Sequence, residues 1–356
     1  MTLVGAERTA WISGGVGLVG SAMGWTWRPM EFPHAWLAAL TCWIGWPLGS
    51  LALIFIHALT GGRWGFAIRR QLATGVATLP LVLPAMLPIL LVLPRLYPWM
   101  HPEVAAHLDN RFYLNAPFFY VRGAIYLIVW LGLGALVLRA LRQENCEAIL
   151  YRLAPPGLIL LVLTVTFSAI DFTLSLEPHF KSSIYGMLIG CEAVLLALSV
   201  AVMGWAFTSN DEPAPVNRDL GRLLFALLVL WAYLDFMQVL IVWNSDLPEE
   251  AAWYVKRLVG DWAGVVALIA VCHFLLPFFA LIWPQVQRSR STMGAVAAML
   301  VLIEAVRAWW IVIPAAGRGL GWVDVAAMTA VLGVAAAIAL RVLRRETPRS
   351  GFAIHA

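Results

Sequence analysis

Apolar and polar positions alternate along the chain in long blocks, giving ten apolar runs joined by short polar connections. Most runs reach the roughly 20 residues that a helix needs to cross a bilayer, and the first is the weakest because it is rich in Gly and Ser. We therefore predict an all-α integral membrane protein, a single polytopic domain over residues 1–356 with ten transmembrane helices. The expected spans are 9–27, 35–60, 73–95, 116–140, 149–170, 184–208, 220–244, 258–283, 292–314 and 323–343.

Composition supports a membrane protein and argues against several functions. The chain is 62% hydrophobic and only 12% charged, and no basic patch interleaved with aromatic residues indicates nucleic-acid binding. Its 4 cysteines are far apart and form no CxxC or CxxCH motif for a metal or a covalent haem. The sequence contains no P-loop, H-E-x-x-H or G-x-S-x-G motif, so ATP hydrolysis and the common hydrolase designs have no local support.

The basic residues predict an orientation in the membrane. Of the 24 Lys and Arg residues, fifteen lie at or beside the two termini and the connections after the even-numbered spans, and seven lie at the other connections. By the positive-inside rule both termini are expected in the cytoplasm. The connection after the fifth span, which includes residues 171–180, is then expected on the opposite side.

That connection concentrates three ionisable groups, Asp171, Glu177 and His179, within nine residues at a span boundary. Ionisable groups placed there can stay hydrated while touching the apolar interior, as proton transfer or a quinone headgroup requires. The alternative is a hydrated turn, because Pro178 and the nearby serines are turn and cap residues. The functional interpretation predicts a hydrated pocket that is linked toward Asp235.

Ionisable residues inside the apolar runs are costly and therefore informative. Asp235 has no cation nearby in sequence, so it is expected either to carry a proton or to join helices as a neutral acid. Glu304 and Arg307 are three residues apart, which predicts an internal ion pair. Histidines on two spans raise the possibility of a bis-His haem, but one such pair is weak support and we expect no haem. The complete set is His57, Glu192, Asp235, His273, Glu304 and Arg307.

Two further patterns bear on structure. Pro80, Pro84 and Pro88 are four residues apart in the third span, which places them on one helical face with unpaired carbonyl groups. Such a face is expected to look into the protein or a hydrated cavity, or to mark a bent helix buried by packing. Residues 244–257 are expected to form either a solvated acidic loop or a short surface helix with an aromatic anchor.

Seven stretches resemble, in the same order, a known family. They are Leu59-Thr-Gly-Gly-Arg-Trp64 with Ile68-Arg-Arg70, Leu96-Tyr-Pro-Trp99, Tyr113-Leu-Asn-Ala-Pro-Phe-Phe119 with Arg122, Asp171-Phe-Thr-Leu-Ser-Leu-Glu-Pro-His179, Trp231-Ala-Tyr233, Pro248-Glu-Glu250 and His273-Phe-Leu-Leu-Pro277. These stretches are similar to the ActF-type membrane subunits of alternative complex III, a bacterial quinol:electron-acceptor oxidoreductase. That family belongs to the NrfD/polysulfide-reductase membrane-anchor group.

The resemblance implies an organisation and a setting. It implies two four-helix bundles, here over residues 35–170 and 184–314, plus two peripheral helices in the bacterial inner membrane. It also implies membrane lipids and respiratory-chain subunits as partners: a multihaem cytochrome, an iron–sulfur protein and an ActC-like membrane subunit. No cofactor is implied in this chain itself; haem and iron–sulfur clusters belong to the partners, with quinol nearby.

Three functions remain open from the sequence. The leading hypothesis is a non-catalytic or proton-conducting subunit of a respiratory quinol oxidoreductase. In it, Asp171, Glu177 and His179 lie at the outer mouth of a proton path whose buried relays are Asp235, His57 and His273. A stand-alone secondary transporter, with broken helices and polar groups near the membrane midplane, is the second. A purely structural anchor, whose ionisable groups only pair helices, is the third.

Overall fold

The protein is an all-α, multi-pass membrane protein, as expected. The computed structural model describes residues 2–208 and 214–345, and within them the chain forms no β-strand. Nine helical segments of these described residues are long and apolar enough to cross a membrane. They are α2 (Phe32–Thr60), α3–α4 (Arg63–Ala77 and Val82–Leu96), α6 (Ala116–Ala140), α7 (Cys146–Phe172), α8 (Tyr185–Thr208), α9 (Ala214–Ser245), α11–α12 (Asp261–Ile269 and Leu276–Ile282), α14 (Arg290–Val312) and α15 (Trp322–Arg345).

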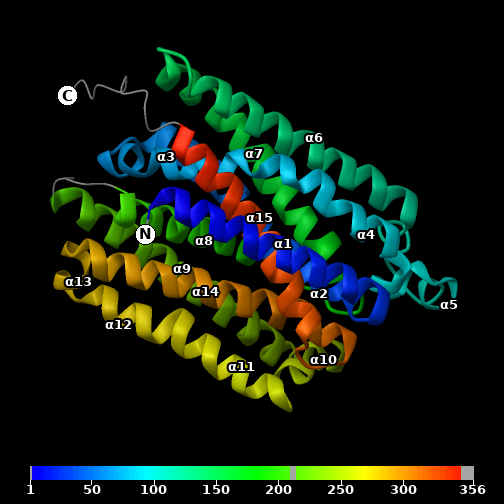
Figure 1. Ribbon diagram of the computed structural model, residues 1–356. Coiled ribbons are helices and arrows are strands. Elements are labelled where there is room, and N and C mark those ends of the chain that lie inside the picture. The colour runs from blue at the N-terminus through cyan, green and yellow to red at the C-terminus, as the bar shows by residue number, and fades with distance from the viewer. Residues whose placement is uncertain (1, 209–213, 346–356) are drawn as a thin grey trace.

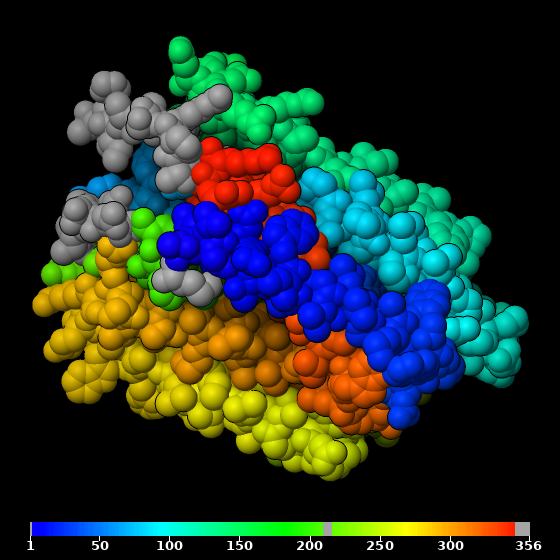
Figure 2. All heavy atoms as spheres, in the orientation of Figure 1, coloured from blue at the N-terminus to red at the C-terminus, as the bar shows by residue number. Residues whose placement is uncertain are grey.

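A tenth long helix, α1 (Leu3–Trp27), lies antiparallel to α15 on the surface of the molecule (Figures 1 and 2). Glu7 forms an ion pair with Arg344 at one end, and Gly24 meets Val323 at the other. Between these ends the contact is very close, because a Cβ atom on Gly17 would lie 2.3 Å from the backbone nitrogen of Ala330. Small residues let helix backbones approach where no hydrophobic effect drives association. The two ends of the described chain therefore lie on the same side.

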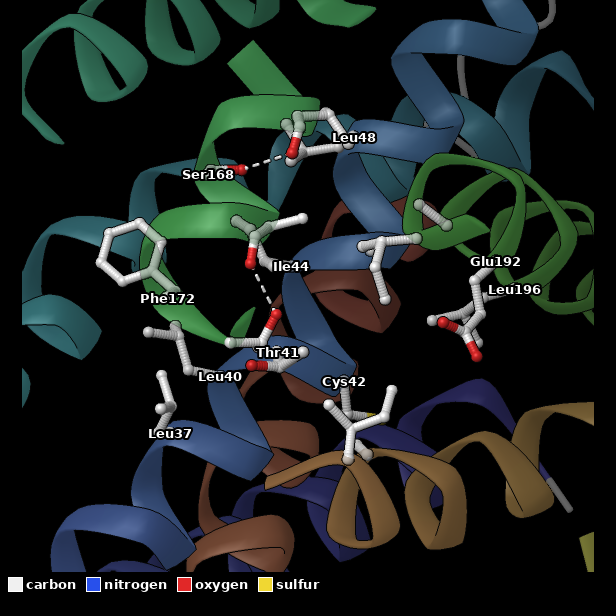
Figure 3. A pocket seen from close by; sticks show the side chains of 18 of the residues that line it. Leu37, Leu40, Thr41, Cys42, Ile44, Leu48, Ser168, Phe172, Glu192 and Leu196 are labelled. Carbon is white, nitrogen blue, oxygen red and sulfur yellow. Dashed lines mark hydrogen bonds between the residues drawn. The ribbon is translucent and has the colours of Figure 1, made fainter. Parts of the chain in front are cut away.

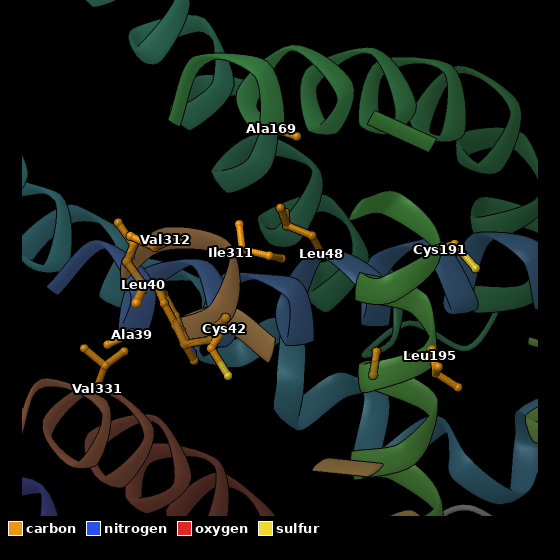
Figure 4. Close-up of a cluster of buried hydrophobic side chains, with 14 of the residues drawn as sticks. Ala39, Leu40, Cys42, Leu48, Ala169, Cys191, Leu195, Ile311, Val312 and Val331 are labelled. Atoms are coloured by element: carbon orange, nitrogen blue, oxygen red, sulfur yellow. The ribbon is translucent and has the colours of Figure 1, made fainter. Parts of the chain in front are cut away.

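Helix α2 forms the centre of the molecule. It packs against α3, α7, α8, α14 and α15, and apolar side chains on all of its faces are buried. A helix that is hydrophobic all round belongs in an interior. Close approach to α8 depends on Gly49, where a Cβ would lie 2.0 Å from the carbonyl oxygen of Ala193. Figure 4 shows the packing on another side, where Ala39 of α2 faces Val331 of α15.

The third predicted span is longer than expected and is broken. Helix α3 begins at Arg63, and the 3-10 turn η1 (Leu79–Leu81) separates it from α4. The expectation that the proline face looks inward is wrong, because Pro80 and Pro84 are exposed and Pro88 is half-buried. Pro80 lies in the break and Pro84 in the first turn of α4. At both places the backbone N–H has no helical acceptor, so its absence costs no helical hydrogen bond.

The polar connections gather at two ends. One end, here called the α10 end, contains residues 97–115 with the short helix α5 (Pro102–Ala105), residues 173–184, and α10 (Pro248–Leu258). These segments touch: Tyr97 donates a hydrogen bond to the Phe172 carbonyl, and Lys256 of α10 pairs with Glu177. The opposite end includes α13 (Pro284–Arg288) and the start of α3.

Of the two sequence interpretations for residues 244–257, the structure has the short helix, α10. Its Trp253 is not an exposed membrane anchor, however. The indole is buried, stacks on Phe180 with ring centroids 4.8 Å apart, and meets Trp310 edge-on. The division into bundles over 35–170 and 184–314 stays a prediction.

Candidate functional site: a buried acid cluster

A group of mostly buried ionisable side chains surrounds Arg307 on α14. Its guanidinium donates to Glu192 on α8 through Nε and to Asp235 on α9 through Nη2, the latter over 2.6 Å. The indole rings of Trp231 and Trp310 flank the guanidinium, with centroids 5.0 and 5.4 Å from its central carbon. Three helices are thus joined through one cation held between aromatic faces.

His273 and Glu304 extend this group. His273 lies on η4 (Ala270–Leu275), a π-helical segment between α11 and α12, and its Nε2 is 3.5 Å from Glu304 Oε2. The imidazole stacks on Trp231 with centroids 3.9 Å apart, and its Nδ1 is buried without a hydrogen-bond partner in the described part of the chain. π-Helical turns concentrate at functional sites because they reposition one side chain. We call Glu192, Asp235, His273, Glu304 and Arg307 the acid cluster.

Charge within the acid cluster is unbalanced. Two carboxyl groups bond to one guanidinium and a third, Glu304, lies nearby; both Glu192 and Glu304 lie in the low-dielectric interior. Several uncompensated negative charges in such a place are very costly, so the cluster must retain at least one proton. Glu304 and His273, the pair without a hydrogen bond to Arg307, are the natural place for it. The arrangement can therefore hold and exchange a proton.

A cavity of about 80 Å³ adjoins the acid cluster in the centre of the molecule. Figure 3 shows Thr41 on α2, Ser168 on α7 and Glu192 on α8 around it. Glu304 and Thr173 also line the cavity, although most of its wall is apolar. A space of this size has room for a few water molecules, and the hydroxyl and carboxyl groups are the partners that such waters need.

The direct ion pair predicted between Glu304 and Arg307 is not among the ion pairs of the described residues, although the Glu304 charge still acts on the guanidinium. Arg307 pairs with Glu192 and Asp235, whereas Glu304 lies beside His273. Asp235 has no cation nearby in sequence, as expected, and its partner Arg307 comes from a helix 72 residues further along the chain. Sequence spacing does not identify the partners of Arg307, because carboxyl groups from neighbouring helices bond to its guanidinium in place of Glu304 on the same helix. The sequence marks Glu192 as an intramembrane carboxyl group, and the structure adds that it bonds to Arg307 and lines the central cavity.

Asp171 does not face a hydrated pocket, which corrects the sequence hypothesis. Its side chain is 1% exposed and accepts two hydrogen bonds from Arg122, each 2.8 Å long, and one from Tyr126 over 2.6 Å. Arg122 also donates to the Tyr113 carbonyl and lies over the Tyr113 ring. Such a bidentate, hydrogen-bonded pair is a closed structural contact between α6 and α7.

Glu177 and His179 lie apart from Asp171. Glu177 pairs with Lys256 and Arg257 of α10, each at 2.6 Å, and His179 is exposed. Burial lowers the pKa of Arg257, and the adjacent Glu177 carboxylate opposes this shift. Arg257 also donates to the Trp310 and Ile311 carbonyls at the end of α14. Asp171, Glu177 and His179 therefore lie in three different environments and do not form one group.

His57 belongs to a separate group at the end opposite α10. Its Nε2 is 2.9 Å from the Gly62 carbonyl oxygen, and its Nδ1 faces Arg69, which pairs with Glu147. Gly65 packs directly against the imidazole, where a Cβ would lie 2.0 Å from the ring. No hydrogen bond or ion pair within residues 2–208 and 214–345 joins His57 to the acid cluster. Of the predicted relays, the structure unites Asp235 and His273 only.

No group of three or more His, Cys, Asp or Glu side chains in the described residues has a geometry that could hold a metal ion. Comparison of the chain with models of known protein families finds no match, and comparison with curated proteins finds none either.

Proposed function

We propose that this chain is a proton-conducting membrane subunit of a bacterial respiratory quinol:electron-acceptor oxidoreductase of the alternative complex III type. The acid cluster carries the proposal: three carboxyl groups and one histidine lie around a single buried guanidinium beside a cavity with room for water. A purely structural group needs no surplus of acids, because one carboxylate neutralises one arginine. The surplus is what a proton-carrying group requires.

The resemblance to the ActF-type subunits gains support from how its stretches lie in space. Tyr97 bonds to Phe172, and Arg122 joins Tyr113 to Asp171, so three of the seven stretches meet at the α10 end. Trp231 and His273, from two others, stack in the acid cluster. Chance matches would be scattered over the fold. Stretches that resemble one family and also contact one another are what a common arrangement of helices would produce.

In this proposal the chain lies in the bacterial inner membrane with both termini in the cytoplasm. Its partners are a multihaem cytochrome, an iron–sulfur protein and an ActC-like membrane subunit. Those partners carry the haem and iron–sulfur groups, quinol is oxidised near this chain, and the acid cluster moves protons coupled to that oxidation.

One feature favours a second candidate, a stand-alone secondary transporter. Two of the membrane-length segments in the described residues are interrupted, α3–α4 by η1 and α11–α12 by the π-helical η4. Interrupted helices beside polar groups are typical of ion and substrate sites in transporters.

Purification separates the two candidates. The chain is tagged in its native host, extracted in a mild detergent, and analysed by mass spectrometry, haem spectroscopy and quinol oxidation. The proposal expects co-purification with multihaem and iron–sulfur subunits and with quinol-oxidising activity. Isolation of the chain alone, with ion or solute uptake after reconstitution into liposomes, would replace it with the transporter.

A further inference from the structure

A second, smaller cavity lies between the acid cluster and the α10 end. Its volume is about 10 Å³, room for about one water molecule. Asp235 and Arg307 line one side of it. The remaining walls come from α8, α9, α10, α14 and the connection before α8: Phe180, Tyr185, Leu188, Ile189, Gln238, Trp253, Tyr254, Trp310 and Ile311.

Asp235 is the most accessible member of the ion-paired group. Its side chain is 31% exposed, against 6% for Glu192 and 2% for Arg307. Asp235 lies ten residues before the end of α9 at Ser245, about 15 Å along the helix axis at 1.5 Å per residue. Asp235 thus lies part-way down the span, so a proton exchanged between it and the α10 end needs a passage along α9.

A hydrogen bond links one wall of this cavity to the connection before α8 at the α10 end. Gln238 follows Asp235 by one helical turn, is buried, and accepts a hydrogen bond from the Ser182 hydroxyl over 2.5 Å. Ser182 is half-buried, and its neighbours Lys181 and Ser183 are exposed. The bond thus joins a buried cavity wall to a solvated connection.

Helix α10 covers the small cavity through Trp253 and Tyr254. Trp253 stacks on Phe180, and Glu177 holds the helix through Lys256 and Arg257. Burial raises the pKa of the adjacent Tyr254, and the nearby Asp235 raises it further, so its hydroxyl stays neutral. Beside this aromatic cover, the Ser182–Gln238 bond is a polar contact between the cavity wall and the connection before α8.

We propose that the acid cluster exchanges protons with the α10 side at Asp235, through a passage that the Ser182–Gln238 hydrogen bond closes. Asp171 takes no part. When the bond opens, Asp235 accepts the proton that the acid cluster holds and passes it to an incoming water, and the resulting hydronium leaves to the bulk. The carboxylate that remains is neutralised by Arg307. The inference rests on the proposed function, since it names the exit of the same acid cluster.

Carboxyl labelling tests the passage without requiring turnover. The full-length protein, purified with whatever subunits accompany it, is treated with a water-soluble carbodiimide and glycine ethyl ester, and amide formation is measured by peptide mass spectrometry. The proposal expects slow labelling of Asp235, a several-fold increase in Ser182→Ala and in Gln238→Ala, and no labelling of Asp171. Ser183→Ala, an exposed neighbour, is the matched control and leaves the rate unchanged. Labelling of the exposed Glu249 normalises each sample.

Three outcomes overturn the passage: Asp235 that stays unlabelled in every variant, equal Asp235 labelling in Ser182→Ala and Ser183→Ala, or labelling of Asp171. Failure of the proposed function gives a different pair of results for labelling and quinol oxidation. In that case Asp235 labelling responds to Ser182→Ala as expected, while the purified protein lacks quinol oxidation.

Discussion

Two buried arginines in this protein have opposite surroundings. Arg122 meets one carboxylate, Asp171, in a bidentate contact that a tyrosine hydroxyl completes. Arg307 meets two carboxylates and has a third acid, Glu304, close by. In the first arrangement each charge has one partner of opposite sign. In the second, the carboxyl groups outnumber the single guanidinium. This difference separates a structural contact from a group able to hold a proton.

Asp171→Asn is therefore expected to weaken the fold rather than proton transfer. The change leaves the buried Arg122 without its counter-charge, which typically costs about 3–5 kcal/mol. Thermal unfolding of the detergent-solubilised protein should show a clear loss of stability, with the exposed Glu103→Gln as control. The double variant Asp171→Leu with Arg122→Met should recover much of that loss. A stable Asp171→Asn protein that has lost proton coupling would restore the sequence hypothesis instead.

Substitution of Arg307 and substitution of Glu304 should change thermal stability by different amounts. Arg307→Met leaves Glu192 and Asp235 without their cation and should lower the unfolding temperature markedly, again by about 3–5 kcal/mol of stability. Glu304→Gln breaks no bond to Arg307 and keeps nearly the same shape, so its unfolding temperature should stay close to that of the unchanged protein. Equal destabilisation by the two variants would indicate a direct Glu304–Arg307 pair.

At the scale of elements, much of the fold could be predicted from hydrophobic runs alone, because a helix must match the bilayer thickness. Helices α6 and α8 have nearly the predicted ends. The break at η1 and the π-helical η4 could not be placed, since both depend on packing between helices. The partners of Arg307 could not be predicted for the same reason, because Asp235 and Glu192 lie 72 and 115 residues away in sequence.

The contact between α1 and α15 offers a matched pair of substitutions. Gly17→Ala places a Cβ against the Ala330 backbone, whereas the neighbouring Gly15 has nothing within 4 Å of that position. Overpacking of this kind costs about 1–3 kcal/mol, so Gly17→Ala should lower thermal stability and Gly15→Ala should not. Susceptibility of α1 to protease in detergent provides a second readout. Equal behaviour of both variants would mean that α1 does not need the close approach.

At the scale of the whole molecule, α1 and α15 run antiparallel, so the two ends of the described chain share one side. Together with the bias of basic residues, this predicts both termini in the cytoplasm. Reporter fusions after Gln143 and at the C-terminus should be active on the cytoplasmic side, and a fusion after Asp109 on the other. A C-terminal reporter active outside the cytoplasm would reverse the orientation.

The acid cluster and the central cavity meet at Glu192 and Glu304, where α2, α8 and α14 come together. The most direct test of a proton-carrying role is the number of protons moved per electron by the purified complex in liposomes, with Glu304→Gln compared with the exposed Glu249→Gln. We expect Glu304→Gln to lose at least half of the proton movement while the complex stays assembled, and Glu249→Gln to keep all of it. An unchanged proton-to-electron ratio in Glu304→Gln would contradict the account and leave the acid cluster a structural group.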